Sequence, residues 1–381
     1  MWALGFPFIL SSLSKRATNR AKETILSLAR NGDASIWRPP RERWGLKYIT
    51  LSDMPKVSVI IPNYNHAPYL RRRIDTVLRQ TFQDFEVILM DDCSTDDSLA
   101  VISGYANDSR IQIKVNEKNS GSTFRQWKKG IALARGEYIW IAESDDYSDE
   151  RFLEQLVAVL EREPKVSFVY CRSWIIKPDG QADGFADWYL TELDARRWTQ
   201  DFCSDGREAC EKHFVHVNSV PNASSVIFRK SVYERVGGVD ETLLVCGDWK
   251  LWVCMAFEGK IAYVGEPLNF YREHQGTVRN KITQTGRGAG EHLAIVGWML
   301  KRVKPTKIIL EKAYVMAAYS WIPAVLSGRT PLRYRLELLW HAFRIDPHAL
   351  RRLIPPGWAA LRFKVALELR HLRQRFEGRA S

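Results

Sequence analysis

Short apolar runs rich in β-branched residues alternate with longer stretches of helical periodicity between residues 57 and 172. Strands that alternate with helices of this length form crossover units on a mostly parallel sheet, and such sheets bind ligands at the carboxyl ends of their strands. The alternation therefore predicts an α/β fold and directs the search for function to the strand ends. Strands are expected at residues 57–62, 86–90, 111–115, 138–142 and 166–171, and helices at residues 69–79, 98–106, 124–134 and 151–161.

The rest of the chain suggests two further regions beside this α/β core. Residues 173–221 are less regular and are expected to form an insertion over the sheet edge, whose pairing the pattern does not predict. Further strands are expected at residues 224–228 and 261–264, and a helix at 249–257. From about residue 290 the pattern is helical and interrupted by prolines. We therefore expect three parts: a basic helical extension at 1–54, the α/β domain at 55–280 and a basic helical region at 281–381.

The net charge of +12 is unevenly distributed along the 381 residues. Residues 291–381 hold 17 Lys or Arg against 6 Asp or Glu, and residues 1–50 hold 9 against 3. The intervening part holds 30 against 35 and is therefore acidic. This division indicates an acidic domain with basic ends rather than a nucleic-acid binder, and no regular interleaving of aromatic and basic residues marks a nucleic-acid platform.

Cysteine usage and hydropathy favour a cytoplasmic protein. The six cysteines are scattered without a CxxC pair, although pairing or metal binding by Cys203 and Cys210 stays open. The apolar run at residues 2–13 contains Pro7, is too short to span a bilayer and lacks a preceding positive charge. No transmembrane helix is predicted.

Carboxylates follow the ends of neighbouring predicted strands. Asp91 and Asp92 end the second strand, and Asp145 and Asp146 follow the fourth. Because like charges repel, a crevice lined with these acids predicts a divalent cation such as Mg²⁺ or Mn²⁺, which takes oxygen ligands and is often completed by substrate phosphates. Alternatively, Asp145 and Asp146 belong to the N-terminus of the helix expected near Asp149.

Several motifs together resemble glycosyltransferase family 2. They are the run Val57 to Asn65 (VSVIIPNYN), the stretch from Gln80-Thr81-Phe82 to Asp92-Cys93-Ser94-Thr95-Asp96, and Ala134-Arg135-Gly136-Glu137-Tyr138 leading to Asp145-Asp146. The likeness covers about residues 55–275. It implies a GT-A fold, which is a Rossmann-like nucleotide-diphospho-sugar transferase fold with a mixed, mostly parallel sheet and flanking helices. It also implies an inverting sugar transfer from a nucleotide diphosphate donor.

The resemblance places the donor at the first, second and fourth strand ends. Asp92 matches the residue that accepts a hydrogen bond from the base of the donor. Asp146 matches the direct ligand of Mn²⁺ or Mg²⁺, and Asp145 lies nearer the ribose. His274, in Tyr271-Arg272-Glu273-His274, either touches the metal or the phosphates or is a plain surface histidine. Pro62, Tyr64 and Asn65 are expected to touch the nucleotide, for which the uridine or thymidine type is favoured.

The second half of the reaction needs a base that takes the proton of the attacking hydroxyl. Asp248 matches the family position for this base, although an N-terminal helix acid beside the core residues Trp249 and Trp252 explains the motif equally from position alone. Residues expected on the acceptor side are Trp249, Asn222, Ser224 and Arg272.

The chain also departs from the family pattern. Trp127-Lys128 stands where many members have Arg-Asn, and the usual Arg after Trp252 is absent, with Cys254 nearby. These differences put phosphate contacts in doubt. The Gln-x-x-Arg-Trp motif of processive synthases is missing, so we expect transfer of one sugar per encounter.

The segment 361–375 places Leu and Val along one helical face and Arg along the other. Such a helix either lies on an anionic membrane surface or packs on the catalytic domain with a solvated charged face. The first alternative suits a peripheral protein at the inner face of the cytoplasmic membrane, a lipid-linked or other glycan acceptor and cell-surface polysaccharide synthesis. A catalytically inactive nucleotide-sugar-binding or membrane scaffold protein is the competing function. A dehydrogenase is excluded because the first strand is followed by Pro-Asn-Tyr-Asn rather than a glycine-rich turn.

Overall fold

A computed structural model describes residues 54–353 except 178–179, 192, 275–285 and 328–329. The predictions for the N-terminal extension up to residue 53 and for the segment 361–375 lie outside the described residues. The described part belongs to one compact unit that begins at Met54.

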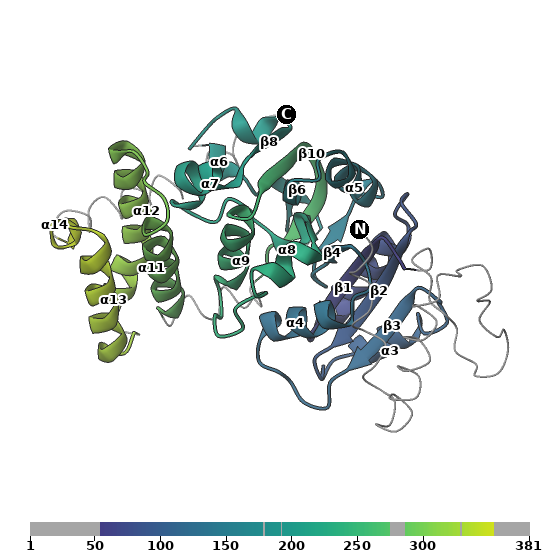
Figure 1. The fold of residues 1–381 in the computed structure, drawn as a ribbon. Coiled ribbons are helices and arrows are strands. Elements are labelled where there is room, and N and C mark those ends of the chain that lie inside the picture. Colours follow the sequence, from purple (N-terminus) through teal and green to yellow (C-terminus); the bar gives the residue numbers. More distant parts are fainter. Residues whose placement is uncertain (1–53, 178–179, 192, 275–285, 328–329, 354–381) are drawn as a thin grey trace, which may run out of the picture. The chain divides into compact units, whose positions relative to one another are not determined.

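The strands and helices follow one another as drawn in Figure 1. The strands are β1 Val57–Asn63, β2 Phe85–Asp91, β3 Ile111–Val115, β4 Tyr138–Ile141, β5 Tyr147–Ser148, β6 Val166–Ile176, β7 Ala182–Phe185, β8 Phe202–Asp205, β9 Val226–Arg229 and β10 Lys260–Arg272. The α-helices of the α/β part are α2 Ala67–Leu78, α3 Ser98–Ser103, α4 Thr123–Leu133, α5 Phe152–Arg162, α6 Trp188–Thr191, α7 Gly206–Ala209, α8 Lys230–Arg235 and α9 Gly247–Ala256. Shorter helical turns are η2 Arg197–Thr199, η3 Cys210–Phe214 and η4 Ala223–Ser225, and the C-terminal helices are α11 Arg287–Leu300, α12 Lys307–Leu326, α13 Leu332–Ile345 and α14 Ala349–Leu353.

The strands form one sheet with the order β3-β2-β1-β4-β9-β6-β10-β5. The first four are parallel. Strand β9 runs antiparallel to both of its neighbours, and β6 pairs in parallel with β10. The carboxyl ends of β1, β2 and β4 therefore open onto the same edge of the sheet, as the crossover pattern predicts.

Helices cover both faces of the sheet, which explains the nearly continuous apolar composition of its central strands. Along β1, Ile60 packs with α4 and α9 on one face, whereas Val59 and Ile61 pack with α2 and α5 on the other. Side chains of a strand alternate between faces, so a strand buried on both sides must be apolar at successive positions. The result is a three-layer arrangement whose loops at the strand ends carry the polar residues.

The C-terminal helices have their own apolar cluster, formed mainly by α11, α12 and α13. Helix α11 also contributes Ile295, Val296 and Met299 to the cluster that covers the sheet. Within the described residues no helix is long and apolar enough to cross a membrane.

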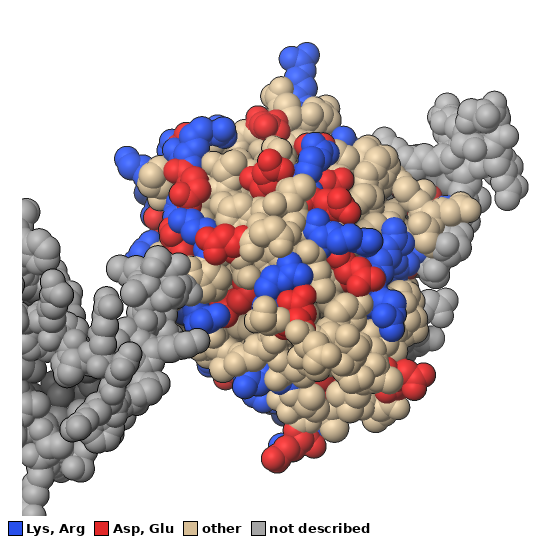
Figure 2. Space-filling model, turned by 90° about the vertical axis from the view of Figure 1, so that its right-hand side faces the viewer, with Lys and Arg blue, Asp and Glu red and all other residues tan. Residues whose placement is uncertain are grey.

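Charged residues of both signs are interspersed on the face of the molecule shown in Figure 2. That face carries no broad field of one sign, so the basic excess of the chain is not concentrated there.

The predicted core elements are confirmed, most of them to within a few residues at each end. Two strands are longer than predicted: β6 continues to Ile176 rather than ending at residue 171, and β10 continues to Arg272 rather than ending at residue 264. Residues 223–225 form the turn η4, so β9 begins at Val226 rather than at residue 224. The irregular part contains β7, which pairs with β6, and β8, which pairs with β10. Cys203 and Cys210 form no disulfide bond with each other, so the pairing that the sequence left open is absent.

Candidate active site

A cavity of about 570 Å³ lies at the carboxyl ends of β1, β2 and β4. It is lined by loops that follow these strands, by the start of α4 and by the start of α9. Most of the residues singled out from the sequence meet here, namely Pro62, Tyr64, Asn65, Asp92, Asp145, Asp146, Asn222, Asp248 and His274. Ser224, Trp249 and Arg272 are not among the residues that line it.

The end of β1 is fixed to the end of β2 by short polar contacts. Asn65 has a positive φ of 57°, a conformation that Asn tolerates better than most residues. Its side-chain oxygen accepts a hydrogen bond from the backbone N–H of Thr95 at 2.7 Å, and its own N–H donates to Ser94 Oγ. Tyr64 beside it is 44% exposed, so its ring is available to a ligand in the cavity.

Asp92 is buried and already accepts hydrogen bonds from three residues. The donors are Asn116 Nδ2 at 2.6 Å, Gln126 Nε2 at 2.9 Å, and both the N–H and the hydroxyl of Ser120. These contacts close the loop between β3 and α4 over the end of β2. The carboxylate therefore shapes one wall of the cavity.

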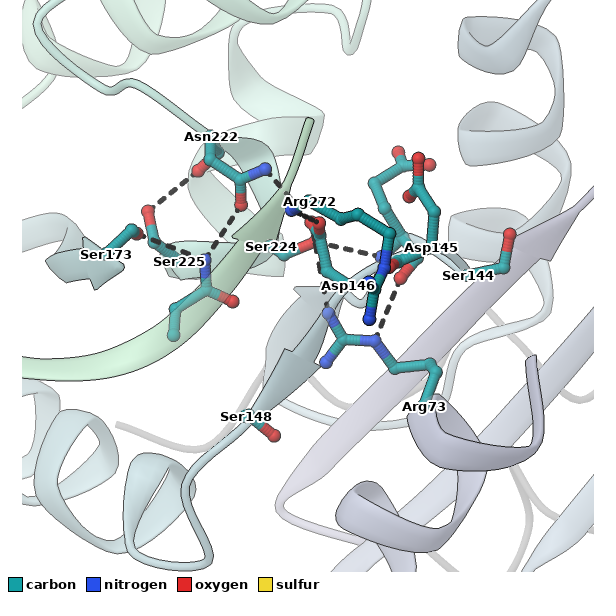
Figure 3. Close-up of polar contacts among 12 residues, drawn as sticks. Arg73, Ser144, Asp145, Asp146, Ser148, Ser173, Asn222, Ser224, Ser225 and Arg272 are labelled. Carbon is teal, nitrogen blue, oxygen red and sulfur yellow. Dashed lines mark hydrogen bonds and ion pairs between the residues drawn. The ribbon is translucent and has the colours of Figure 1, made fainter. Parts of the chain in front are cut away.

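Asp146 lies in the cavity wall and is almost fully buried there in a network of fixed donors (Figure 3). Its Oδ2 accepts from Asn222 Nδ2 at 2.9 Å and from Ser224 Oγ at 2.6 Å, and its Oδ1 accepts from the backbone N–H of Arg272 at 2.9 Å. Burial raises the pKa of Asp146 to about 6, and repulsion by Asp145 adds to the shift. The network ties the loop after β4 to η4 and to the end of β10.

Asp145 points to two histidines instead. His274 Nε2 lies 3.0 Å from Asp145 Oδ2, and one ligand atom each of His66, Asp145 and His274 lie within 4.8 Å of one another. Burial raises the pKa of Asp145, but the hydrogen bond from His274 and the charge of His66 outweigh it, so the pKa lies below its ordinary value. A carboxylate that stays ionised beside two imidazoles has the donor set of a metal site.

The loop after β4 rests on a buried arginine. The Arg73 side chain is fully buried, its Nε donates to the backbone oxygen of Glu143 at 2.8 Å, and its Nη2 lies 4.0 Å from Asp146 Oδ2. Burial lowers the pKa of Arg73 to about 10, so the guanidinium stays charged at neutral pH. An internal cation thus partly neutralises the acids that line the cavity.

Glu143 is the third acid of this loop. Burial raises its pKa to about 8, with the charge of Asp145 adding to the effect. Its Oε1 accepts a hydrogen bond from Trp127 Nε1 at 2.7 Å. Trp127, which departs from the family pattern, therefore serves to hold Glu143.

Asp248 lies in the first turn of α9 and lines the same cavity as Asp145. Its Oδ2 accepts from Asn218 Nδ2 at 2.9 Å, which orients the carboxylate. The preceding Gly247 touches Phe124 of α4 so closely that a methyl group there would lie 2.6 Å from the ring. Glycine is required at this position because α9 begins directly against α4.

The structure decides between several of the alternatives that the sequence left open. Helix α5 begins at Phe152 with Arg151 at its N-cap, so the interpretation of Asp145 and Asp146 as the N-terminus of that helix is wrong. His274 is not a plain surface histidine, because its side chain contacts Asp145 and stacks near His66 and Tyr69. Trp249 and Trp252 are buried, as the core interpretation expects.

Three residues at the site escaped the sequence analysis: His66, Arg73 and Asn218. A signal existed for two of them. His66 directly follows the strand-end run that ends at Asn65, and Arg73 falls between Leu70, Ile74 and Val77 on the apolar face of its helix. Asn218 lies in the irregular segment, where no pattern fixes its neighbours.

Comparison with known proteins gives the family. Residues 58–212 match the model of glycosyl transferase family 2. An uncharacterized glycosyltransferase of Nostoc sp. is 31% identical over 230 residues, which are 58% of this chain and 65% of that protein. An uncharacterized protein of Mycobacterium tuberculosis is 28% identical over 315 residues, 80% of this chain and 84% of its own length.

A third relative is the poly(ribitol-phosphate) beta-N-acetylglucosaminyltransferase TarS of Staphylococcus aureus, 33% identical over 110 residues, 28% of this chain and 19% of TarS. The crystal structure of S. aureus TarS 1-349 with UDP-GlcNAc superposes with a TM-score of 0.59 at 16% identity, covering 78% of this chain and 84% of that one. This likeness shows a shared fold, the GT-A fold that the motifs predict. With these relatives beside the matched family model, residues 58–212 of the chain belong to glycosyl transferase family 2.

Proposed function

We propose that this protein is an inverting glycosyltransferase, which moves a sugar from a nucleotide diphosphate donor to an acceptor hydroxyl with Asp248 as the general base. The observation that carries the proposal is that Asp92, Asp145, Asp146 and Asp248 line one cavity although they come from three separate parts of the chain. Scattered surface acids would not converge in this way. The cavity is large enough for a ligand of nucleotide-sugar size.

The donor occupies the side of the cavity formed by β1, β2 and β4. Tyr64 offers an exposed ring against which the base of the nucleotide stacks, and Pro62 and Asn65 shape the same wall. Protein donors already surround the Asp92 carboxylate, so its main role is to hold the loop around Ser120. When the donor binds, a hydrogen bond from the nucleotide base to Asp92 replaces one of these protein donors. We favour a uridine or thymidine diphosphate donor.

The residues at the cavity fit a divalent cation, and the geometry favours Asp145 over the predicted Asp146 as its ligand. The Asp146 carboxylate is engaged by Asn222, Ser224 and Arg272, whereas Asp145 groups with His66 and His274. Two imidazoles and a carboxylate suit Mn²⁺ better than Mg²⁺, which prefers oxygen ligands and waters. When bound, the cation neutralises the diphosphate leaving group.

The proposed base belongs to the part of the wall that the start of α9 contributes. Asp248 takes the proton of the acceptor hydroxyl as that oxygen attacks the anomeric carbon, and Asn218 keeps the carboxylate turned toward the cavity. Asn222 lines the acceptor side of the cavity. Ser224 and Arg272 hold the Asp146 carboxylate in place, and the buried Trp249 anchors α9. Attack from the face opposite the leaving diphosphate inverts the anomeric configuration.

The function is tested with a panel of nucleotide sugars that includes UDP-GlcNAc, because the relative TarS is an N-acetylglucosaminyltransferase. Donor binding is measured as a thermal shift in Mn²⁺ and in EDTA, and transfer is followed by release of the nucleotide diphosphate. Asp248→Asn should keep the donor shift while transfer falls by about 10³-fold or more, as for loss of a general base with its positioned charge. Transfer unchanged in this variant would remove Asp248 from that role. Donor binding without any turnover in the wild type would favour the inactive scaffold.

We propose further that the protein is peripheral at an anionic membrane surface, which would bring it to a lipid-linked acceptor of cell-surface polysaccharide synthesis. Helix α13 supports this proposal because its outward face is apolar. Leu332, Leu336 and Trp340, spaced by one helical turn, are 68%, 58% and 54% exposed, while Leu338 and Ala342 on the opposite face are buried. An ordinary surface helix also buries one apolar face, but it exposes polar side chains in place of such an apolar stripe.

The basic charge around the exposed face of α13 favours an anionic lipid surface as its partner. Residues 307–353 hold 8 Lys or Arg against 3 Asp or Glu, and Arg344 of α13 lies 4.4 Å from the Trp340 ring. The remaining chain, residues 354–381, is basic as well, with 6 Lys or Arg against 2 Asp or Glu, so like charges oppose its docking here. The same repulsion opposes the α13 face of a second copy. Anionic headgroups complement the arginines, and the acyl chains below them complement the exposed apolar side chains.

Flotation with vesicles tests the membrane contact. The wild type should float with phosphatidylglycerol-containing vesicles and much less with pure phosphatidylcholine. The double variant Leu336→Ser/Trp340→Ser should lose most of this binding, whereas Leu99→Ser, which alters an exposed leucine of α3, should not. Equal flotation of both variants and the wild type would discard α13 as the contact.

A further inference from the structure

Helix α11 holds the loop that leads to the proposed base through one carboxylate. Glu291 is partly buried, and its Oε1 accepts a hydrogen bond from the backbone N–H of Leu244 at 2.8 Å. Its Oε2 accepts from the N–H groups of Val245 and Cys246 at 2.9 and 2.8 Å. Three consecutive backbone donors therefore converge on a single side chain that lies more than 40 residues away in the sequence.

These backbone donors lie directly before α9, the helix whose first turn carries Asp248. Cys246 is the N-cap of α9, and no side-chain hydrogen bond of its own caps the helix. The first N–H groups of a helix have no partner within the helix, and the positive end of the helix dipole attracts an anion. Glu291 binds the N–H group of this N-cap residue and those of the two residues before it, so its negative charge lies beside the N-terminus of α9. Such charge-assisted hydrogen bonds are stronger than neutral ones.

Two further contacts hold the same segment. Gly247 lies against the Phe124 ring of α4, and the Trp249 ring meets His292 of α11 edge to face at 4.9 Å. Because Leu244, Val245 and Asp248 line the cavity, the segment that contributes this wall is fixed on its outer side by neighbouring residues of α11.

We infer that Glu291 is a positioning residue for sugar transfer: by binding the N–H groups of residues 244–246 it fixes the start of α9 and with it the direction of the Asp248 carboxylate. This inference rests on the proposed function of Asp248. It extends the active site to the C-terminal helices, outside the matched family segment of residues 58–212. A glutamine cannot replace the carboxylate, because its amide NH₂ would face backbone N–H groups where an acceptor is needed.

Hydrogen exchange of the full-length protein tests the structural half of the inference. In Glu291→Gln the amides of Leu244, Val245 and Cys246 should exchange about tenfold to hundredfold faster, which corresponds to loss of hydrogen bonds to a charged group. Peptides from β1 and β2 should be unchanged. Glu337→Gln, which neutralises an exposed glutamate of α13, is the matched control and should leave the peptide spanning residues 240–249 as in the wild type. Unchanged exchange in Glu291→Gln overturns the inference whatever the activity.

Kinetics test the other half. Glu291→Gln should lower kcat at least tenfold while the KM for the nucleotide sugar stays within about twofold, because the donor wall is untouched and only the base is misaligned. Glu291→Asp keeps the charge on a shorter side chain and should recover part of the loss in both exchange and kcat. Faster exchange with unchanged kcat, or a parallel loss of donor binding, overturns the positioning role. If Glu291→Gln does not fold, Glu291→Asp and Glu291→Ala take its place. Exchange rates and kcat equal to those of the wild type in both variants then overturn the inference.

A wild-type protein that transfers no sugar would refute the proposed function and not this contact. The exchange experiment uses no donor, so it still decides whether Glu291 fixes the loop.

Discussion

Arg73 provides the sharpest test of how the acidic cavity is stabilised. Replacing it with Leu removes the buried guanidinium but keeps an apolar side chain of helical propensity in α2. The Asp146 carboxylate, which is 2% exposed, then loses the cation 4.0 Å away. The hydrogen bond from Arg73 Nε to the Glu143 backbone is lost as well.

The magnitude follows from this geometry. Two unit charges 4.0 Å apart attract by about 4 kcal/mol at an effective dielectric constant of 20. The Leu variant does not have to desolvate a guanidinium, which offsets part of the loss, and measured losses for breaking one partner of a buried pair are about 3–5 kcal/mol. We therefore expect Arg73→Leu to lower the free energy of unfolding by about 3–5 kcal/mol. Arg73→Lys keeps the charge and loses the Nε contact, so about 1–3 kcal/mol is expected.

Urea unfolding followed by tryptophan fluorescence in EDTA measures both variants without a competing metal ion. Arg71→Leu, at an exposed position of the same helix, controls for removal of a surface charge and should change stability by less than about 0.5 kcal/mol. Because the Arg73–Asp146 pair is buried, the difference between the Leu and Lys variants should persist from 0.05 to 0.5 M NaCl. If Arg73→Leu is no less stable than Arg73→Lys, the guanidinium does not neutralise this loop.

Three other outcomes are expected. Asp145→Asn should abolish the Mn²⁺-dependent part of the thermal shift, while Asp146→Asn should mainly lower stability; the reverse result would restore Asp146 as the ligand. Asn218→Ala should lower kcat by about 10- to 100-fold with donor affinity unchanged, since Asp248 loses an oriented hydrogen bond; a rise in the donor KM alone would refute this. Burial, with a contribution from the charge of Lys312, lowers the pKa of His216 to about 4. In the unfolded chain the same imidazole binds a proton near pH 6.5, so the folded state loses stability as the pH falls from about 6.5 to 4. His216→Phe should reduce that slope by about 1.4 kcal/mol per pH unit in urea titrations, and an unchanged slope would exclude His216 as a source.

The sequence was sufficient for the sheet and for the location of the cavity. Strands such as Val57–Asn63 are buried on both faces, so their apolar runs and the helical periods between them fix the crossover topology. Once the topology is set, the acids after β2 and β4 and the segment before α9 must meet at one edge. The short strands β7 and β8 escaped prediction because their pairing depends on distant partners rather than on their own pattern.

The different partners of the two adjacent acids in the cavity wall were not predictable. Asp145 and Asp146 lie in an irregular loop between β4 and β5, where no period assigns directions to side chains. The side-chain directions depend on the hydrogen-bond partners. Asn222, Ser224 and Arg272 donate to Asp146, whereas Asp145 lies beside His66 and His274. These partners come from segments up to 129 residues away.

The basic C-terminal region is joined to the catalytic part by more than chain connectivity. On one side of α11, Leu293 packs with α12 and α13, and on another, Val296 and Met299 pack in the cluster that covers the sheet. Glu291 of the same helix binds the loop before Asp248. A truncation before α11 would therefore expose apolar surface beside the sheet and release the wall that carries the proposed base. For this reason the role of the basic region at a membrane is best tested by side-chain changes on the outward face of α13, which leave α11 in place, rather than by removing residues 281–381.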